Sequence, residues 1–238
     1  MTSSLRVKHW PATVFVLAVA VVLSSCTTAV DGSPTAAPQT GTSLASSPAA
    51  APPPGANLQA LVLPVEDLRR IMNDPTMVKI ATWRHPGIGL SIVFTPPQCS
   101  VVVGPGMHAA LDGSGHTGVY YVTYTSTTSV MVQVTQGVVG FADPAAARAL
   151  IVAQQAVWQQ CANIDVGIKI GDRSGTQHDN ALQANGDTLS MMYGFGPMQC
   201  MRTLAARNAV VIDNVLCSAD PTVAATAVLN GMADKIPH

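Results

Sequence analysis

Cysteine positions constrain the fold of this 238-residue chain more than any other feature of its sequence. Cys26 lies near the N-terminus, directly after a short apolar run that is typical of a signal peptide. The other four cysteines lie further along the chain, at Cys99, Cys161, Cys200 and Cys217. An exported protein enters an oxidising compartment, where an even number of cysteines predicts disulfides. Four cysteines allow three different pairings.

The segment from Gln199 to Cys217 decides among these pairings. It contains two stretches of strand-forming residues, which predict a β-hairpin. If the turn centres on Asn208 and Ala209, then Cys200 and Cys217 lie equally far from it and face each other at a separation that suits a disulfide. The remaining pair is then Cys99 with Cys161. Zinc ligation is disfavoured, because the sequence has no Cys-x-x-Cys pair with a nearby histidine.

The first 26 residues have the organisation of a bacterial lipoprotein signal. Two basic residues precede an apolar run, Ala12 to Leu23, that is too short to span a membrane. Ser24-Ser25 then leads to Cys26, in an order that resembles a lipobox. We expect residues 1–25 to be removed and Cys26 to carry diacylglyceryl and N-acyl groups, which anchor a protein almost permanently. The alternative is an ordinary secretory signal, in which Cys26 is incidental.

Residues 26–56 predict a disordered stalk. Ala, Ser, Thr and Pro dominate this segment, and Asp31 is its only charged residue. Closely spaced prolines prevent a helix, and no periodic apolar face is present to be buried. A random coil of this length reaches about 30 Å. We therefore expect residues 57–238 to form one domain that the stalk holds clear of the membrane surface.

The domain is predicted to be α+β, with a mostly antiparallel sheet packed by helices. Helices are predicted at Val65–Met72, at Ala145–Ala162 and from Asp220-Pro221 to Lys235. Asp143 and Pro144 favour the start of the second helix, as its cap and its first residue. Strands are predicted at Gly118–Thr125, Val130–Phe141, Ile164–Ile170, Thr188–Tyr193, Gln199–Ala206 and Ala209–Cys217.

Composition and motifs argue against several classes of function. Twelve basic against thirteen acidic residues exclude a strongly basic nucleic-acid binder. Gly113 to Gly118 match the dinucleotide motif G-x-G-x-x-G, but the next residues predict a strand where that motif requires a helix. His108 and His116 flank Asp112 without a regular spacing for metal ligation, and we expect no metal or cofactor. His178-Asp179 is predicted to be a solvated loop.

No catalytic constellation is evident in the sequence. Glu66 and Asp67 are explained by the dipole of the helix that they begin. Ser114 lacks the strand-to-helix elbow of a hydrolase nucleophile, and the cysteines are expected to be oxidised. We therefore do not predict an enzyme.

Tyrosines supply the candidate ligand-binding residues. Tyr120, Tyr121 and Tyr124 lie on one predicted strand, and alternation sends Tyr121 to the face opposite the other two. Tyr193 lies in the methionine-rich segment 191–198, which offers adaptable apolar contacts. These four tyrosines either form the wall of a ligand cleft or pack in the core.

The cysteine pattern with its neighbours resembles the PknH-like extracellular domain of mycobacteria and their relatives. The resemblance rests on Trp158-x-x-Cys161, Cys200-x-Arg202 and the Val-rich strand that follows Asn208, and it covers most of residues 61–237. That family contains the sensor domain of a receptor Ser/Thr kinase and many free-standing lipoproteins. It implies one α+β domain, the two disulfides above, and a solvent-filled cleft proposed to bind a ligand. Because this chain carries no kinase domain, signalling would require a separate partner.

The sequence thus predicts a lipid-anchored, sensor-like or ligand-binding module on the extracytoplasmic face of the cell membrane. Its partner is expected to be a small envelope ligand or an envelope protein. The alternative is a structural lipoprotein that binds cell-wall polymer or a membrane protein through a flat surface. An envelope hydrolase is a third hypothesis.

Overall fold

The computed structural model describes residues 57–87, 91–129 and 132–237, which form one folded unit. The predicted signal peptide, Cys26 and the predicted stalk lie outside the described residues. No helix in the described part is long and apolar enough to cross a membrane.

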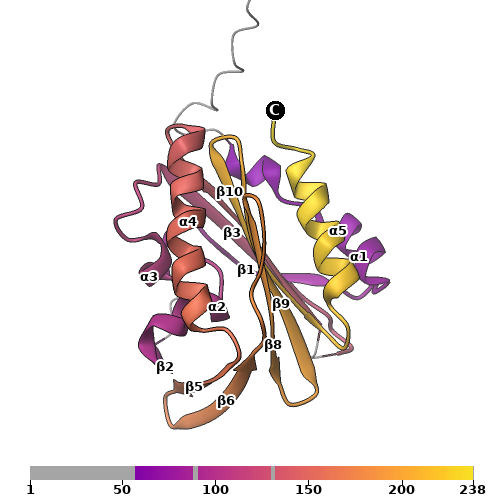
Figure 1. The fold of residues 1–238 in the computed structure, drawn as a ribbon. Helices are drawn as coiled ribbons and strands as arrows, with labels where there is room; N and C mark the ends of the chain where they lie inside the picture. Colours follow the sequence, from indigo (N-terminus) through magenta and orange to yellow (C-terminus); the bar gives the residue numbers. More distant parts are fainter. Residues whose placement is uncertain (1–56, 88–90, 130–131, 238) are drawn as a thin grey trace, which may run out of the picture. The chain divides into compact units, whose positions relative to one another are not determined.

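A single antiparallel sheet forms the centre of the domain (Figure 1). Its strands are β1 (Val78–Trp83), β2 (Ile92–Thr95), β3 (Gly118–Thr125), β4 (Gln133–Gly140), β5 (Ile164–Ile170), β6 (Arg173–Asp179), β7 (Gln183–Asn185), β8 (Thr188–Phe195), β9 (Met198–Arg207) and β10 (Val210–Ser218). Neighbouring strands follow the order β1-β3-β4-β10-β9-β8-β6-β5-β2, and β7 pairs with β8. The two edges of the sheet are therefore β1 and β2. This architecture confirms the predicted α+β class.

Helices cover both faces of the sheet (Figure 1). One face, here called the α4 face, carries α4 (Pro144–Gln160), the short helices α2 (Ser100–Val103) and α3 (His108–Leu111), and the 3-10 turn η2 (Pro97–Cys99). The other, the α5 face, carries α5 (Thr222–Ala233), α1 (Val65–Met72) and the 3-10 turn η1 (Leu58–Leu61). Each face buries its own apolar cluster, so the sheet lies between two cores.

The helices begin close to where the sequence predicts. Asp143 caps α4 by accepting a hydrogen bond from the backbone N–H of Ala146 at 2.8 Å, and Pro144 is the first residue of the helix. The predicted helix at Val65–Met72 has these same bounds in the structure. The C-terminal helix is shorter than predicted at both ends, at Thr222–Ala233.

The hairpin of β9 and β10 has the predicted register. Asn208 adopts the left-handed conformation in the turn, with φ 51°. Cys200 therefore faces Cys217 across the two strands, and the two residues form a disulfide. A second disulfide joins Cys99 to Cys161 and so ties the start of α2 to the end of α4. The fold thus contains two disulfides in the predicted pairing.

Four of the strands were not predicted from the sequence: β1, β2, β6 and β7. The prediction that His178-Asp179 is a solvated loop was wrong, because both residues belong to β6. The missed strands β1, β2 and β7 are short or largely exposed, and β6 has almost no apolar residues. None of these strands therefore shows the strong apolar pattern by which a strand is recognised. Although His178 is exposed, Asp179 is completely buried, because β6 pairs with β8 at these two residues.

Candidate functional site

A cleft opens on the α4 face of the sheet, beside the residues that α4 covers. Its volume is about 370 Å³, and we call it the sheet cleft. Side chains of five adjacent strands form its floor: Thr123, Gln133, Thr135, Val215, Cys217, Cys200, Met198 and Tyr193. The disulfide of the β9–β10 hairpin is thus part of the floor.

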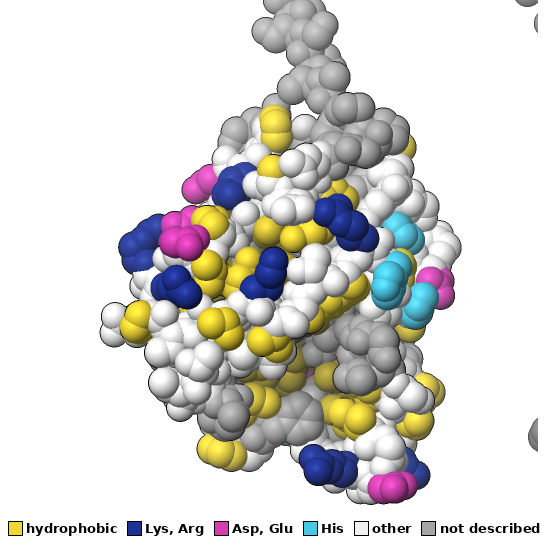
Figure 2. All heavy atoms as spheres, turned by 180° about the vertical axis from the view of Figure 1, so that it is seen from behind, with side chains coloured by type: hydrophobic (Ala, Val, Ile, Leu, Met, Phe, Trp, Pro, Cys, Tyr) yellow, Lys and Arg dark blue, Asp and Glu magenta, His cyan; other side chains and the backbone are white. Residues whose placement is uncertain are grey.

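Both edges of the sheet contribute walls to the sheet cleft. β1 supplies Ile80, Ala81 and Trp83, while β2 supplies Ile92 and Phe94. Val103 at the end of α2, together with Gly104, Pro105 and Met107, completes the lining, and we call residues 104–107 the roof loop. On the far side of the molecule from Figure 1, hydrophobic side chains gather around a hollow in the surface (Figure 2).

The lining of the sheet cleft is uncharged. Its described lining residues include no Asp, Glu, Lys, Arg or His. Several of its polar groups bond to one another or to the backbone: the hydroxyls of Thr123 and Thr135 are 2.9 Å apart, and the Tyr193 hydroxyl donates to the Val103 carbonyl at 2.5 Å. This lining therefore suits an apolar ligand group better than an ionic one.

A buried carboxylate fixes the roof loop to the sheet. Asp213 of β10 accepts hydrogen bonds at Oδ2 from the backbone N–H of Gly106 and from the Tyr121 hydroxyl, both at 2.8 Å. Its other oxygen, Oδ1, forms an ion pair with Arg202 of β9. All of these side chains are almost fully buried. Burial, followed by the charge of Asp213, raises the pKa of Tyr121 well above its ordinary value, so this hydroxyl remains a donor.

Arg202 connects the same carboxylate to the surrounding backbone. Its guanidinium donates to the carbonyl of Asn214 at 2.8 Å and to the carbonyl of Gly104 in the roof loop at 3.4 Å. It also lies over the Trp158 ring, at 5.6 Å from the ring centroid. The Arg202–Asp213 pair therefore joins β9, β10, α4 and the roof loop at one buried point.

Two glycines make room for the Tyr121 ring in this network. A Cβ atom at Gly137 would lie 2.0 Å from the ring, and a Cβ atom at Gly106 would lie 2.9 Å from it. Gly106 also adopts a φ of 72°, which favours glycine. Trp83 stacks on the Tyr121 ring with a centroid distance of 5.4 Å. Because Trp83 lines the sheet cleft, Tyr121 packs against the outer side of one cleft wall.

The four predicted tyrosines occupy three different environments. Tyr193 lines the sheet cleft. Tyr121 lies on the same α4 face, in the buried network beside the cleft. Tyr120 and Tyr124 point to the opposite face, as alternation predicts, and pack in the core on the α5 face. Because Tyr120 and Tyr124 are buried there, they are core residues and do not form the wall of a ligand cleft.

The sequence contained an unused signal for Arg202 and Asp213. Each is a charged residue inside an otherwise apolar strand, which is unusual in a buried sheet. The predicted hairpin register places Arg202 opposite Val215, two residues along β10 from Asp213, so their side chains share one face as diagonal neighbours. The register that paired the cysteines therefore also predicts this ion pair.

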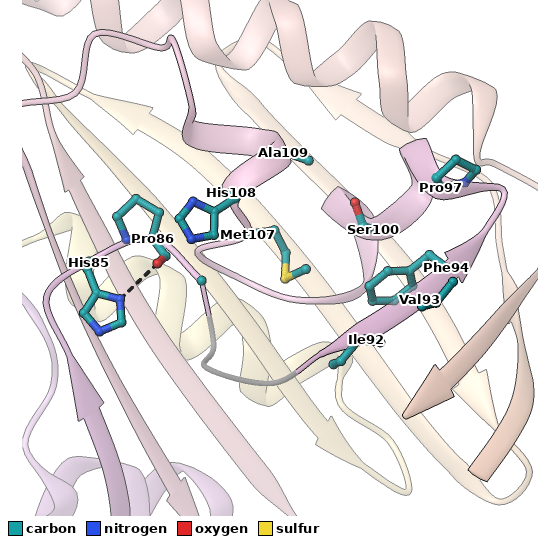
Figure 3. A pocket seen from close by; sticks show the side chains of 11 residues that line it. His85, Pro86, Ile92, Val93, Phe94, Pro97, Ser100, Met107, His108 and Ala109 are labelled. Carbon is teal, nitrogen blue, oxygen red and sulfur yellow. Dashed lines mark hydrogen bonds between the residues drawn. The ribbon is translucent and has the colours of Figure 1, made fainter. Parts of the chain in front are cut away.

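The structure contains a second cavity, of about 580 Å³, whose lining side chains are drawn in Figure 3. The two cavities share Ile92, Phe94 and Met107 in their linings. We call the second one the histidine cavity, because His85 and His108 line it together with Ser100. In Figure 3 the thioether of Met107 lies between the His108 backbone and the Phe94 ring.

The histidines that were considered as metal ligands have other partners. His108 lies 3.2 Å from Asp112, and His116 lies 3.2 Å from the hydroxyl of Ser114. The described residues contain no group of three His, Cys, Asp or Glu side chains arranged to hold a metal ion. Gly113 and Gly115, which belong to the G-x-G-x-x-G match, have positive φ in a turn, and β3 follows them.

Asp179 is a second buried carboxyl on β6. It is completely buried, and Oδ1 accepts a hydrogen bond from the Gln177 amide at 2.5 Å. Burial raises its pKa from 3.8 to about 6, although the bond from Gln177 acts in the opposite direction. Asp179 faces Tyr193 across the two residue pairs that join β6 to β8. The Asp179 side chain therefore lies on the same face of the sheet as Tyr193, beside the floor of the sheet cleft.

Comparisons with known proteins agree on the relationships of this chain. A family model described as "PknH-like extracellular domain" matches residues 53–235. The fold is similar to the crystal structure of the extracellular domain of PknH from Mycobacterium tuberculosis, with a TM-score of 0.70 and 20% sequence identity. That match covers 75% of this chain and 93% of the PknH chain. No curated protein sequence matches this chain.

Proposed function

The chain belongs to the PknH-like extracellular domain family, and we propose that it is a lipid-anchored, extracytoplasmic module that binds a ligand in the sheet cleft. The family model covers nearly all of the described residues. Its description places such domains outside the cell, and the two disulfides of the fold are typical of that environment.

The observation that supports ligand binding is a concave, apolar cavity whose roof is already held in place. Ligand sites usually have volumes of about 300 to 1,000 Å³ and a mostly apolar lining. The sheet cleft has this size, at about 370 Å³, and this chemistry. Because Asp213 and Arg202 fix the roof loop, little conformational entropy remains to be lost when a ligand binds.

The same observation favours a binding module over a structural lipoprotein. A structural role through a flat surface requires a broad apolar patch without concavity. Two exposed apolar side chains of the edge strands, Ile80 and Val93, instead lie at the walls of the two cavities.

The proposal is tested by filling the sheet cleft. Val215 lies on its floor, so Val215→Trp places an indole in the space that a ligand needs. In thermal-shift measurements against lipid and aqueous extracts of a bacterial envelope, we expect an active extract to raise the Tm of the wild type. At 100 times the dissociation constant a ligand adds about 2.7 kcal/mol, or about 5 to 10 °C for a domain of this size. Val215→Trp should abolish this rise.

Val152→Trp is the matched control. It makes the same substitution on the outer surface of α4, where the Val152 side chain is 68% exposed. This variant should respond to the extract as the wild type does. An equal rise in Tm for Val215→Trp, or no rise with either extract, would contradict binding in the sheet cleft.

The lipid anchor is tested separately at Cys26. We expect Cys26→Ala to move the protein from the membrane fraction to the medium or the soluble envelope fraction, because only the acyl chains hold it to the bilayer. Fractionation and immunoblotting measure this redistribution, and metabolic labelling with palmitate reports acylation. Ser25→Ala, which keeps a small residue before the cysteine, is the control. Retention of the Cys26→Ala protein on the membrane would refute the anchor.

A further inference from the structure

We propose that the ligand is a single-chain amphiphile, with its alkyl chain in the sheet cleft and an oxygen-containing polar head in the histidine cavity. This inference rests on the proposed function, because it names the chemical class of the ligand. It rests on two cavities that share part of their linings, of which only the second has histidine side chains among its described lining residues.

The sheet cleft fits the alkyl part of such a ligand. Its floor offers the Cys200–Cys217 disulfide and Val215, and its walls are mostly apolar. A charged group placed there would lose its hydration without gaining an opposite charge from the described lining residues. An alkyl chain gains free energy with every methylene that leaves water.

A chain that extends from one cavity into the other would have to cross the boundary between them. Among the described residues, the two linings share Ile92, Phe94 and Met107. Met107 is partly exposed and unbranched, so its thioether can change rotamer at little cost. Figure 3 shows this side chain directed toward Phe94, at the border of the histidine cavity.

The histidine cavity fits the polar head. Nδ1 of His85 is 3.0 Å from the carbonyl of Pro86, and Nδ1 of His108 is 3.2 Å from Asp112. The Nε2 atoms take no part in these two contacts, although Nε2 of His108 lies close to Gly87, and the Ser100 hydroxyl lies in the same lining. We place the head group at these nitrogen atoms and this hydroxyl. No Lys or Arg lines this cavity in the described part of the chain. A head that hydrogen-bonds through oxygen, such as a carboxyl or hydroxyl, therefore suits it better than a phosphate.

The inference is tested with saturated fatty acids of increasing length, from octanoic to tetradecanoic acid, and with the matching n-alcohols. The full chain carrying Cys26→Ala is used, so that its own acyl groups do not compete. Calorimetry below the critical micelle concentration should show Kd falling about fourfold with each added methylene, which corresponds to about 0.8 kcal/mol. The fall should end when the chain fills the sheet cleft.

Two variants distinguish the contribution of the ligand's alkyl chain to binding from that of its polar head group. Val215→Trp should weaken binding most for the longer chains and so flatten the dependence on length. His108→Leu should weaken binding of every member about fivefold to tenfold, as expected for a lost hydrogen bond, without changing that dependence. His178→Leu is the matched control, since His178 is exposed on β6 and does not line either cavity. Comparing acids with alcohols identifies the preferred head.

Affinity that does not depend on chain length, or an unchanged length dependence in Val215→Trp, would overturn the inference. Its failure is distinguishable from failure of the proposed function. If no acid or alcohol binds, but an aqueous envelope extract still raises the Tm of the wild type and not of Val215→Trp, then the cleft binds a ligand of another class. If no extract raises the Tm either, both proposals are wrong.

Discussion

Asp213→Ala is expected to lower the free energy of unfolding by about 3 to 5 kcal/mol, because it leaves the buried Arg202 without its counter-ion. The substitution also removes the acceptor of the Gly106 N–H and of the Tyr121 hydroxyl. Urea denaturation measures the loss. Tyr121→Phe, which removes one hydrogen bond and retains the ion pair, should cost only about 1 kcal/mol.

A double variant shows whether the cost arises from an unpaired charge. Arg202→Met combined with Asp213→Leu removes both charges and retains most of the buried volume, so it should be more stable than Asp213→Ala. If the free-energy changes of the separate substitutions simply add up in the double variant, the ion pair is not the source of the effect. Hydrogen exchange at the Gly106 amide should accelerate in Asp213→Ala, because this amide loses its acceptor.

Asp179→Asn is expected to stabilise the protein at neutral pH and to change its dependence on pH. The pKa of Asp179 is raised in the folded state, from 3.8 to about 6, so folding favours the protonated form. Its contribution to stability is complete below pH 3.8, is lost as pH rises through 6, and amounts to roughly 2 to 3 kcal/mol. Asparagine retains the acceptor for Gln177 and removes the buried charge.

The measurement is urea denaturation of both proteins between pH 4 and pH 7.5. The difference in unfolding free energy should favour Asp179→Asn at pH 7.5 and shrink toward pH 4. Because both proteins share their histidines, the difference isolates Asp179. Asp165→Asn, on the exposed side of the neighbouring strand, should not reproduce it, since this side chain is 72% exposed. A difference that does not vary with pH would show that the carboxyl does not titrate in this range.

The start of α4 and the pairing of β9 with β10 were predicted correctly from the sequence, because in both places the local sequence preferences favour the conformation that the packing of the fold requires. α4 begins directly after Asp143, because the aspartate side chain caps the helix and the following proline suits its first position. β9 and β10 pair correctly because a tight turn at Asn208 joins two buried strands, and this register fixes one disulfide. In both places, residues close together in the sequence determine the local structure, so the sequence alone is sufficient to predict it.

The candidate site was harder to predict because distant segments build it. Trp83 of β1, Phe94 of β2 and Tyr193 of β8 meet in one cleft, and only the order of strands in the sheet explains why. Alternation placed Tyr120 and Tyr124 on one face, but it does not reveal that α5 and α1 cover that face. The environment of Asp179 likewise depends on β8, which follows it in the sequence.

The disulfide in the cleft floor makes the proposed binding surface depend on where the protein matures. Cys200 and Cys217 remain separate thiols in a reducing cytoplasm and become one sulfur bridge only after export. The ligand that we propose for the sheet cleft would contact that bridge. If the sheet cleft binds a ligand as proposed, its floor is therefore complete only after the disulfide has formed, and a chain with both thiols reduced lacks part of that surface.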